Sequence, residues 1–323
     1  MNKSTEYLKP YSPSFWKAYL IQMRPYLMFV SGISGLAGMS IAGTGNFDIY
    51  DQLLAFAPLF LGYGFGQALT DCFQLDTDII SAPYRPLSQG LINVKWVMIV
   101  SIAGLLLISG ILVYLNSWNI LLCLLSIVGL ASYSIVKKRY WFAGPFYNAW
   151  IVALLPVMGY ISLTGQDLEI LAGTKIQLLI ALSFFSYAHF VLIGYLKDIS
   201  ADKAAGYKTL PVVFGWNWAV RISTVFILAS IWFCYKLVDG SIPGLIVMII
   251  ASLIVIGGQL YAFFTENKTE SNSVLPISSS VRGFILWHIS VILAFRPDLI
   301  FVCFIYYCFF ELSFYLRPEK NQI

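Results

Sequence analysis

The sequence is poor in charged residues and contains only two histidines. Charged side chains make up 11% of the 323 residues, against about 25% in soluble domains, and 59% of the residues are hydrophobic. This composition excludes an ordinary soluble domain, and the small net charge of +4 gives no reason to expect a nucleic-acid partner. His189 and His288 are too few for a histidine-rich metal site, and the five cysteines have neither disulfide nor metal-binding spacing.

Long apolar runs are what the sequence has in abundance. They approach about 20 residues, the length at which an α-helix crosses a bilayer. The runs lie near residues 25–43, 52–69, 94–115, 118–136, 145–164, 176–196, 217–237, 243–264, 283–295 and 299–316. Residues 296–298 include a proline and either kink one long last helix or separate two short ones. We therefore predict an all-α, polytopic transmembrane helical bundle of nine helices, or of ten if the last helix is divided.

Lysines and arginines are distributed unevenly between the two ends of these runs. Fifteen of them lie before residue 290 on one side, against Lys175 and Lys236 on the other. Cytoplasmic loops carry such an excess, so we expect the amino terminus and the charged loops in the cytoplasm, and an integral protein of a bacterial inner membrane. The predicted parts are a cytoplasmic amphipathic lead-in, a single transmembrane domain and a short tail, over residues 1–24, 25–316 and 317–323.

A polar stretch, TDCFQLDTDIISAPYRPLSQG at residues 70–90, follows the second apolar run. If it continues the preceding helix, Asp71 and Asp78 lie about two turns apart and point almost the same way. Gln74 lies between them on nearly that face, whereas Asp76 is rotated by about 140° from Asp71. The sequence therefore predicts a pair of carboxylates on one face, with Asp76 pointing elsewhere.

A second polar stretch, YLKDISADKAAGYKTLPVVFG at residues 195–215, follows the sixth run on the same side. Asp198 and Asp202 are four residues apart and would stack on one helical face. Like charges in that arrangement repel each other unless a cation lies between them, and Lys197 and Lys208 supply positive charge nearby. The two stretches together suggest one site that is assembled from two halves of the bundle.

Acidic pairs beside basic residues suit a phosphate group that is bridged by Mg²⁺. This ion takes one or two carboxylates together with phosphate oxygens and waters, and both stretches lack the imidazole ligands that would favour zinc. Arg85, between two prolines, adds bidentate recognition of phosphate oxygens. Charged loops between membrane spans often serve only solubility and topology. Two such loops on one side, each with basic residues, favour a binding site over that alternative.

At these two stretches the chain resembles the UbiA superfamily of intramembrane prenyltransferases. The first family motif is N-D-x-x-D-x-x-x-D, followed by a proline–arginine–proline stretch and a glycine, and Asp71, Asp78 and PYRPLSQG match it. SAPYRPLSQG looks most like the chlorophyll-synthase and homogentisate-prenyltransferase branches. The second motif, K-D-x-x-x-D with a later G-x-x-T-L, is matched by Lys197, Asp198, Asp202, Gly206, Thr209 and Leu210. Weaker matches are MRP at residues 23–25 and YSIVKKRY at residues 133–140.

The first motif departs from the family pattern at two positions. Thr70 stands where the family has asparagine, and Gln74 stands where it has the middle aspartate. Both side chains offer an oxygen, but the neutral Gln74 binds Mg²⁺ less strongly than a carboxylate does. The resemblance therefore implies that one metal is held more loosely, that Gln74 contacts the diphosphate directly, or that Asp76 takes over in an irregular helix.

The resemblance implies a UbiA-like fold and a Mg²⁺-dependent enzyme. Such an enzyme transfers an isoprenyl group from a prenyl diphosphate donor to a hydrophobic or aromatic acceptor and releases diphosphate. The expected catalytic carboxylates are Asp71, Asp78, Asp198 and Asp202, which would hold the metal together with Gln74. The expected substrate-binding residues are Gln74, Arg85, Tyr133, Lys138, Arg139, Asn148, Lys197 and Lys208. Asn148 is included because a polar residue within a membrane span is a functional candidate by default.

Two other functions are compatible with the same residues. A UbiA-type terpene cyclase would use the same diphosphate site, and the cation would close on its own chain instead of meeting an acceptor. A transporter or scaffold with ion-binding loops would place polar residues on both sides of the midplane, whereas the charge collects on one side here.

Overall fold

The computed structural model describes residues 7–43 and 48–319, and helices dominate this part of the chain. Within these residues nine helical segments are long and apolar enough to cross a membrane, and α2 (Pro25–Ile41) is a shorter apolar helix. No strand occurs in the described ranges, where the extended pairing is an isolated bridge between Leu8 and Ile92. These findings confirm the predicted all-α bundle of an integral membrane protein.

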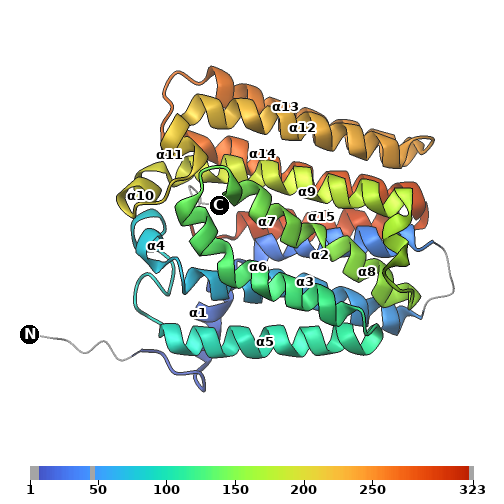
Figure 1. The fold of residues 1–323 in the computed structure, drawn as a ribbon, viewed down its shortest axis with the longest axis horizontal. Coiled ribbons are helices and arrows are strands. Elements are labelled where there is room, and N and C mark those ends of the chain that lie inside the picture. Colours follow the sequence, from blue (N-terminus) through green and yellow to red (C-terminus); the bar gives the residue numbers. More distant parts are fainter. Residues whose placement is uncertain (1–6, 44–47, 320–323) are drawn as a thin grey trace, which may run out of the picture.

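The helices lie side by side in one bundle (Figure 1). Those of the first half are α1 (Pro13–Met23), α2, α3 (Ile49–Asp71), α4 (Leu75–Ser81), α5 (Val94–Leu115) and α6 (Asn119–Arg139). Those of the second half are α7 (Ala143–Ala153), α8 (Leu155–Thr164), α9 (Thr174–Gly194), α10 (Ile199–Ala204), α11 (Leu210–Phe214), α12 (Trp216–Val238), α13 (Ile242–Phe264), α14 (Val274–Phe295) and α15 (Ile300–Tyr315). Short 3-10 helices occupy Leu168–Ala172, Tyr195–Lys197, Glu270–Ser273 and Pro297–Leu299.

The two polar stretches meet at one end of the bundle. The short helices α4 and α10, one from each stretch, gather there together with α11 (Figure 1), and α4 packs against α10. The expected site assembled from two halves of the bundle therefore has a structural basis.

Prolines separate helices at two places. Pro156, in the first turn of α8, has no backbone N–H to donate. The series of backbone hydrogen bonds in α7 therefore ends just before it. Near the carboxyl end, Pro297 opens a 3-10 turn between α14 and α15. The break at residues 296–298 thus separates two helices rather than kinking one.

Helix α14 begins at Val274, well before the predicted start near residue 283. Serines at residues 278–280 and Arg282 interrupt the apolar residues just before the predicted start. Ser278 and Ser280 donate hydrogen bonds of 2.9 and 2.7 Å to backbone carbonyl oxygens three residues earlier. The hydroxyl groups are satisfied within the helix itself, so α14 can be buried along most of its length.

Helices α2 and α8 approach closely because small residues lie at their contact. A Cβ atom added at Gly38 would lie 1.9 Å from the carbonyl oxygen of Pro156. A Cβ atom added at Gly159 would lie 2.2 Å from the carbonyl oxygen of Gly35. Such glycines allow backbones to pack directly in a membrane bundle.

Helix α1 packs against α3, with Phe15 and Tyr19 buried and Trp16 and Leu20 exposed. This two-sided arrangement suits the predicted amphipathic lead-in. Residues 1–6 of that lead-in and 320–323 of the predicted tail lie outside the described residues, and the domain boundaries stay predictions.

Candidate functional site

A cavity of about 240 Å³ lies among helices α2, α3 and α5–α9. Its charged lining residues lie at the end of the bundle where α4 and α10 meet: Arg24, Asp71, Asp78, Arg85, Lys137, Lys197 and Asp198. Apolar side chains of α5, α6 and α8 line much of the remainder, among them Leu105, Ile108, Leu130 and Met158. The cavity therefore joins a charged end to an apolar interior.

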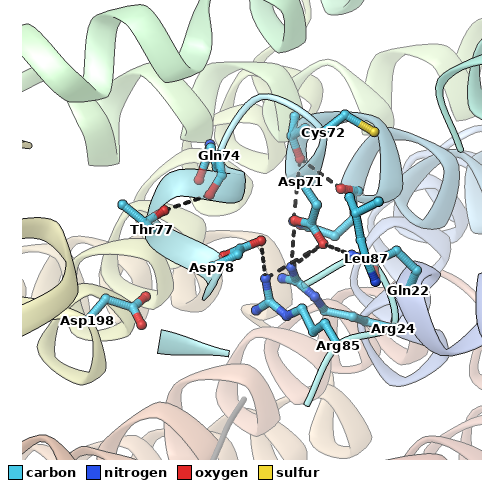
Figure 2. A network of polar contacts seen from close by, with 12 residues as sticks. Gln22, Arg24, Asp71, Cys72, Gln74, Thr77, Asp78, Arg85, Leu87 and Asp198 are labelled. Carbon is cyan, nitrogen blue, oxygen red and sulfur yellow. Dashed lines mark hydrogen bonds and ion pairs between the residues drawn. The ribbon is translucent and has the colours of Figure 1, made fainter. Parts of the chain in front are cut away.

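Asp71 is the most heavily hydrogen-bonded carboxylate at the charged end (Figure 2). Nη2 of Arg24 donates to both of its oxygens at 2.7 Å, and Nε2 of Gln67 donates to Oδ1 at 3.0 Å. Gln22, on α1, donates to Oδ2. A carboxylate offers about four acceptor positions, so Asp71 has little free capacity left.

Arg85 joins the two aspartates of the first motif. Its Nη1 atom lies 2.6 Å from Oδ2 of Asp78 and 3.6 Å from Oδ2 of Asp71 (Figure 2). The chain between them does not form the continuous helix that the spacing predicted. Helix α3 ends at Asp71, Gln74 has φ −118° and ψ 20° outside the helical range, and α4 begins at Leu75. The two carboxylates therefore meet through the arginine and not through stacking on one helix.

The second motif places its two aspartates in different environments. Asp198 lines the cavity and lies 2.8 Å from Nζ of Lys197. Asp202 is fully buried, does not line the cavity, and accepts a hydrogen bond of 3.1 Å from Oγ1 of Thr209. Because only Asp198 faces the cavity, the predicted pair is not presented to a ligand as a pair.

Lys137 is the basic residue of α6 that reaches the cavity, and the sequence prediction missed it. Its Nζ atom lies 3.1 Å from Oδ1 of Asp202 and 5.0 Å from the ring centroids of both Tyr195 and Tyr207. The helical period could have identified Lys137, because it lies four residues after Tyr133 on the same face and Tyr133 also lines the cavity.

Other basic residues that the sequence singled out lie outside the cavity. Lys138, Arg139 and Lys208 are exposed. Lys138 pairs at 3.4 Å with Asp76, which is about half exposed and does not line the cavity. Asp76 thus points away from the cavity. Rotation about one continuous helix is not the reason, because α3 and α4 are separate helices.

Neutral polar groups complete the lining. The hydroxyl groups of Tyr133 and Tyr195 are 2.9 Å apart, and those of Tyr63 and Tyr187 are 3.0 Å apart. All four tyrosines line the cavity, as does the predicted residue Asn148. Tyr63, Tyr187 and Tyr195 could not be singled out in a chain with 20 tyrosines. Gln74 lines the cavity too and donates to Oγ of Ser134 at 3.0 Å.

Burial and the neighbouring cations act differently on the carboxylates outside the membrane spans. Burial raises the pKa of Asp78, and Arg85 offsets this only in part. Burial likewise raises the pKa of Asp202 against the attraction of Lys137. It acts in the same direction on Asp198, but the ammonium groups of neighbouring lysines outweigh it and hold the pKa of Asp198 below its usual value. Asp198 is therefore the most firmly ionised of the three.

The charged end offers oxygen ligands without a preformed metal cage. Within residues 7–43 and 48–319, no group of three or more His, Cys, Asp or Glu side chains is arranged to hold a metal ion. Asp78, Asp198 and Gln74 bring side-chain oxygens to the cavity, and such hard ligands suit Mg²⁺. An ion bound there would need further oxygens from a ligand or water, as Mg²⁺ has in phosphate sites.

Comparisons with known proteins point to one family. A model of the UbiA prenyltransferase family matches residues 31–289. A digeranylgeranylglyceryl phosphate synthase of Thermococcus kodakarensis is 29% identical over 218 residues, which cover 67% of this chain and 76% of that relative. The apo structure of a UbiA homologue from Aeropyrum pernix has a TM-score of 0.68 at 18% identity and covers 79% of this chain and 94% of that one. A UbiA homologue from Archaeoglobus fulgidus, bound to GPP and Mg²⁺, has a TM-score of 0.62 at 20% identity and covers 85% and 99%.

Proposed function

The chain belongs to the UbiA prenyltransferase family, and we propose that it transfers an isoprenyl group from a prenyl diphosphate to a hydrophobic or aromatic acceptor, with release of diphosphate. One observation carries this proposal: both polar stretches contribute acidic and basic side chains to the charged end of a single cavity whose remainder is largely apolar. A diphosphate matches the charged end, and an isoprenyl chain matches the apolar walls.

The cationic side chains of the cavity would bind the diphosphate. Arg85 offers a planar guanidinium that suits phosphate oxygens, and Lys137 and Lys197 offer compact ammonium groups. Each of the three is paired with an aspartate, which fixes its position before a substrate arrives. Lys138, Arg139 and Lys208 are less suited to this role because they lie outside the cavity.

The oxygen ligands at the charged end fit Mg²⁺. Asp78, Asp198 and Gln74 would hold the ion, whereas the oxygens of Asp71 already accept from three side chains and Asp202 does not reach the cavity. The Archaeoglobus homologue bound to GPP and Mg²⁺ supports this cofactor. When bound, Mg²⁺ neutralises charge on the diphosphate.

The residues of this chain would assist the reaction by orientation, electrostatics and exclusion of water. As the bond between the first prenyl carbon and oxygen breaks, its electron pair stays with the diphosphate, where Arg85, Lys137 and Lys197 stabilise the added charge. The apolar walls keep water from the cation that remains, and the faces of Tyr133 and Tyr187 can attract it. The acceptor then forms the new bond to that carbon and releases a proton.

The identity of the acceptor and the orientation of the protein in the membrane are further proposals. The name of the Thermococcus relative refers to a prenylated glyceryl phosphate, which favours testing a lipid-like acceptor beside aromatic ones. The excess of lysines and arginines on the side of the charged end supports a cytoplasmic site. The predicted bacterial inner membrane stays a prediction, and the relative named above is archaeal.

A donor and acceptor screen tests the proposal. Purified protein in detergent is incubated with geranyl, farnesyl or geranylgeranyl diphosphate, with and without Mg²⁺, and with an aromatic acid or a prenylated glyceryl phosphate as acceptor. We expect Mg²⁺-dependent release of diphosphate and a new product that contains both the prenyl chain and the acceptor. A cyclic hydrocarbon formed without acceptor would indicate the terpene cyclase instead, and no turnover with any pair would contradict the proposal.

A further inference from the structure

Gln22 connects the two ends of the first polar stretch from a helix outside it. The side chain is fully buried near the end of α1. Its Nε2 group donates to Oδ2 of Asp71, and its Oε1 atom accepts from the backbone N–H of Leu87 at 3.2 Å (Figure 2). Asp71 ends α3, and Leu87 lies two residues after Arg85. One amide therefore ties the most heavily bonded carboxylate of the site to the segment that carries Arg85.

The backbone bends two residues after Gln22. Arg24 has φ 52° and ψ 70°, and among the described residues it is the only non-glycine with a positive φ. This conformation costs free energy for a residue with a side chain and persists where the surrounding contacts impose it. The bend lets α1 end and α2 begin around Arg24, so that Gln22 and Arg24 both reach Asp71.

We propose that Gln22 is a positioning residue for the diphosphate site, which it serves by orienting Asp71 and the Arg85 segment; this rests on the proposed prenyl transfer. Gln22 does not line the cavity, so it would act through its two partners and not on the substrate. Gln22 also lies before residues 31–289, the part of the chain that the family model matches, and it is not one of the motif residues named above.

The chemistry of the amide explains why glutamine suits this position. An amide donates and accepts at the same time, which Asp71 and the N–H of Leu87 require from a single side chain. An apolar side chain of the same length would leave the N–H of Leu87 buried without a partner and free one acceptor position of Asp71. Both ends of the stretch could then shift, and a misplacement of about 1 Å is enough to reduce a rate by about a hundredfold.

The test compares Gln22→Met with a matched control, Gln259→Met. Gln259 is also buried and donates to the backbone carbonyl of Val220 at 2.6 Å, but it joins α13 to α12 and does not line the cavity. Both variants should lower the thermal midpoint of unfolding. Only Gln22→Met should also weaken the binding of inorganic diphosphate in the presence of Mg²⁺ by about tenfold or more, with a matching fall in transfer rate.

Two readouts separate this inference from the proposed function. Wild-type protein that binds diphosphate without transferring a prenyl group would contradict prenyl transfer and still allow the positioning role to be measured by binding. Gln22→Met protein that binds diphosphate like the wild type, or that loses binding no more than Gln259→Met, would overturn the positioning role.

If Gln22→Met does not fold, Gln22→Glu tests the positioning role instead. This variant keeps the hydrogen bond from the N–H of Leu87 but places a carboxylate beside that of Asp71. We expect the same loss of diphosphate binding, and wild-type affinity would refute the role.

Discussion

The ammonium group of Lys137 lies 3.1 Å from Oδ1 of Asp202, and both side chains are buried. This ion pair links the end of α6 to α10, and hence the two halves of the bundle. A buried charge without a partner is costly, so each residue holds the other in place. Since only Lys137 faces the cavity, the second aspartate of the second motif would act on a ligand through this lysine.

Lys137→Met should reduce prenyl transfer by about a hundredfold or more, because it removes a buried cation at the point where negative charge develops. Lys138→Met should stay close to the wild-type rate, because Lys138 is half exposed and pairs with Asp76 outside the cavity. Steady-state rates at saturating donor measure both variants. A larger loss from Lys138→Met than from Lys137→Met would contradict the role of Lys137 as the basic residue of α6 at the cavity.

Asp198→Ala and Asp202→Ala should each abolish measurable transfer, but only the second should strongly destabilise the fold. Asp202→Ala leaves Lys137 buried without its partner, a change that costs about 3–5 kcal/mol in comparable cases. Lys197 is the partner of Asp198, and its side chain retains 11% exposure, so water can compensate in part.

Thermal unfolding in detergent, followed beside the transfer assay, separates the two variants. The double variant Lys137→Met/Asp202→Leu should regain much of the lost thermal midpoint without regaining activity, because it removes both buried charges. Wild-type rates in both single variants would exclude the proposed site.

Gln74→Asp should lower the Mg²⁺ concentration required for half-maximal activity. It replaces a neutral oxygen ligand on the cavity wall with a carboxylate, which binds a hard cation more strongly. Gln89→Asp, on an exposed side chain of the same polar stretch, makes the same change of charge outside the cavity and should have no such effect. Equal Mg²⁺ dependence of Gln74→Asp and the wild type would argue that Gln74 does not approach the ion.

Gly38→Ala should destabilise the protein by about 1–3 kcal/mol, the usual cost of overpacking. The added methyl group would meet the backbone of Pro156, and backbone cannot move aside as a side chain can. Gly110→Ala is the matched control on α5, where an added Cβ meets nothing within 4 Å. It should be neutral or stabilise by up to about 1 kcal/mol, because alanine favours helix. Equal thermal midpoints for the two variants would contradict the close contact of α2 and α8.

Much of the helical framework could be predicted because a bilayer imposes both length and apolar composition on each span. The run at residues 94–115 coincides with α5, and Pro297 marked the division between α14 and α15. The start of α14 could not be predicted, because serines that bond to their own helix resemble the polar residues of a loop. Composition alone does not distinguish the two cases.

The sequence indicated which residues belong to the site better than it indicated how they contact one another. Asp78, Asp198, Arg85 and Lys197 line the cavity, as the motifs suggested. The break between α3 and α4 could not be foreseen, because residue spacing does not reveal whether a helix continues. Contacts that depend on packing between helices, such as those of Gln22, leave no pattern in the sequence.

The pairing of every aspartate at the charged end with a basic side chain has a consequence for affinity. Arg24, Arg85, Lys137 and Lys197 balance Asp71, Asp78, Asp198 and Asp202 when all are ionised. A diphosphate bound among these eight side chains meets formal charges that cancel, so the eight together supply no net charge to balance its own. Electroneutrality then favours entry together with a divalent cation, and donor affinity should follow the concentration of that cation more steeply than total ionic strength.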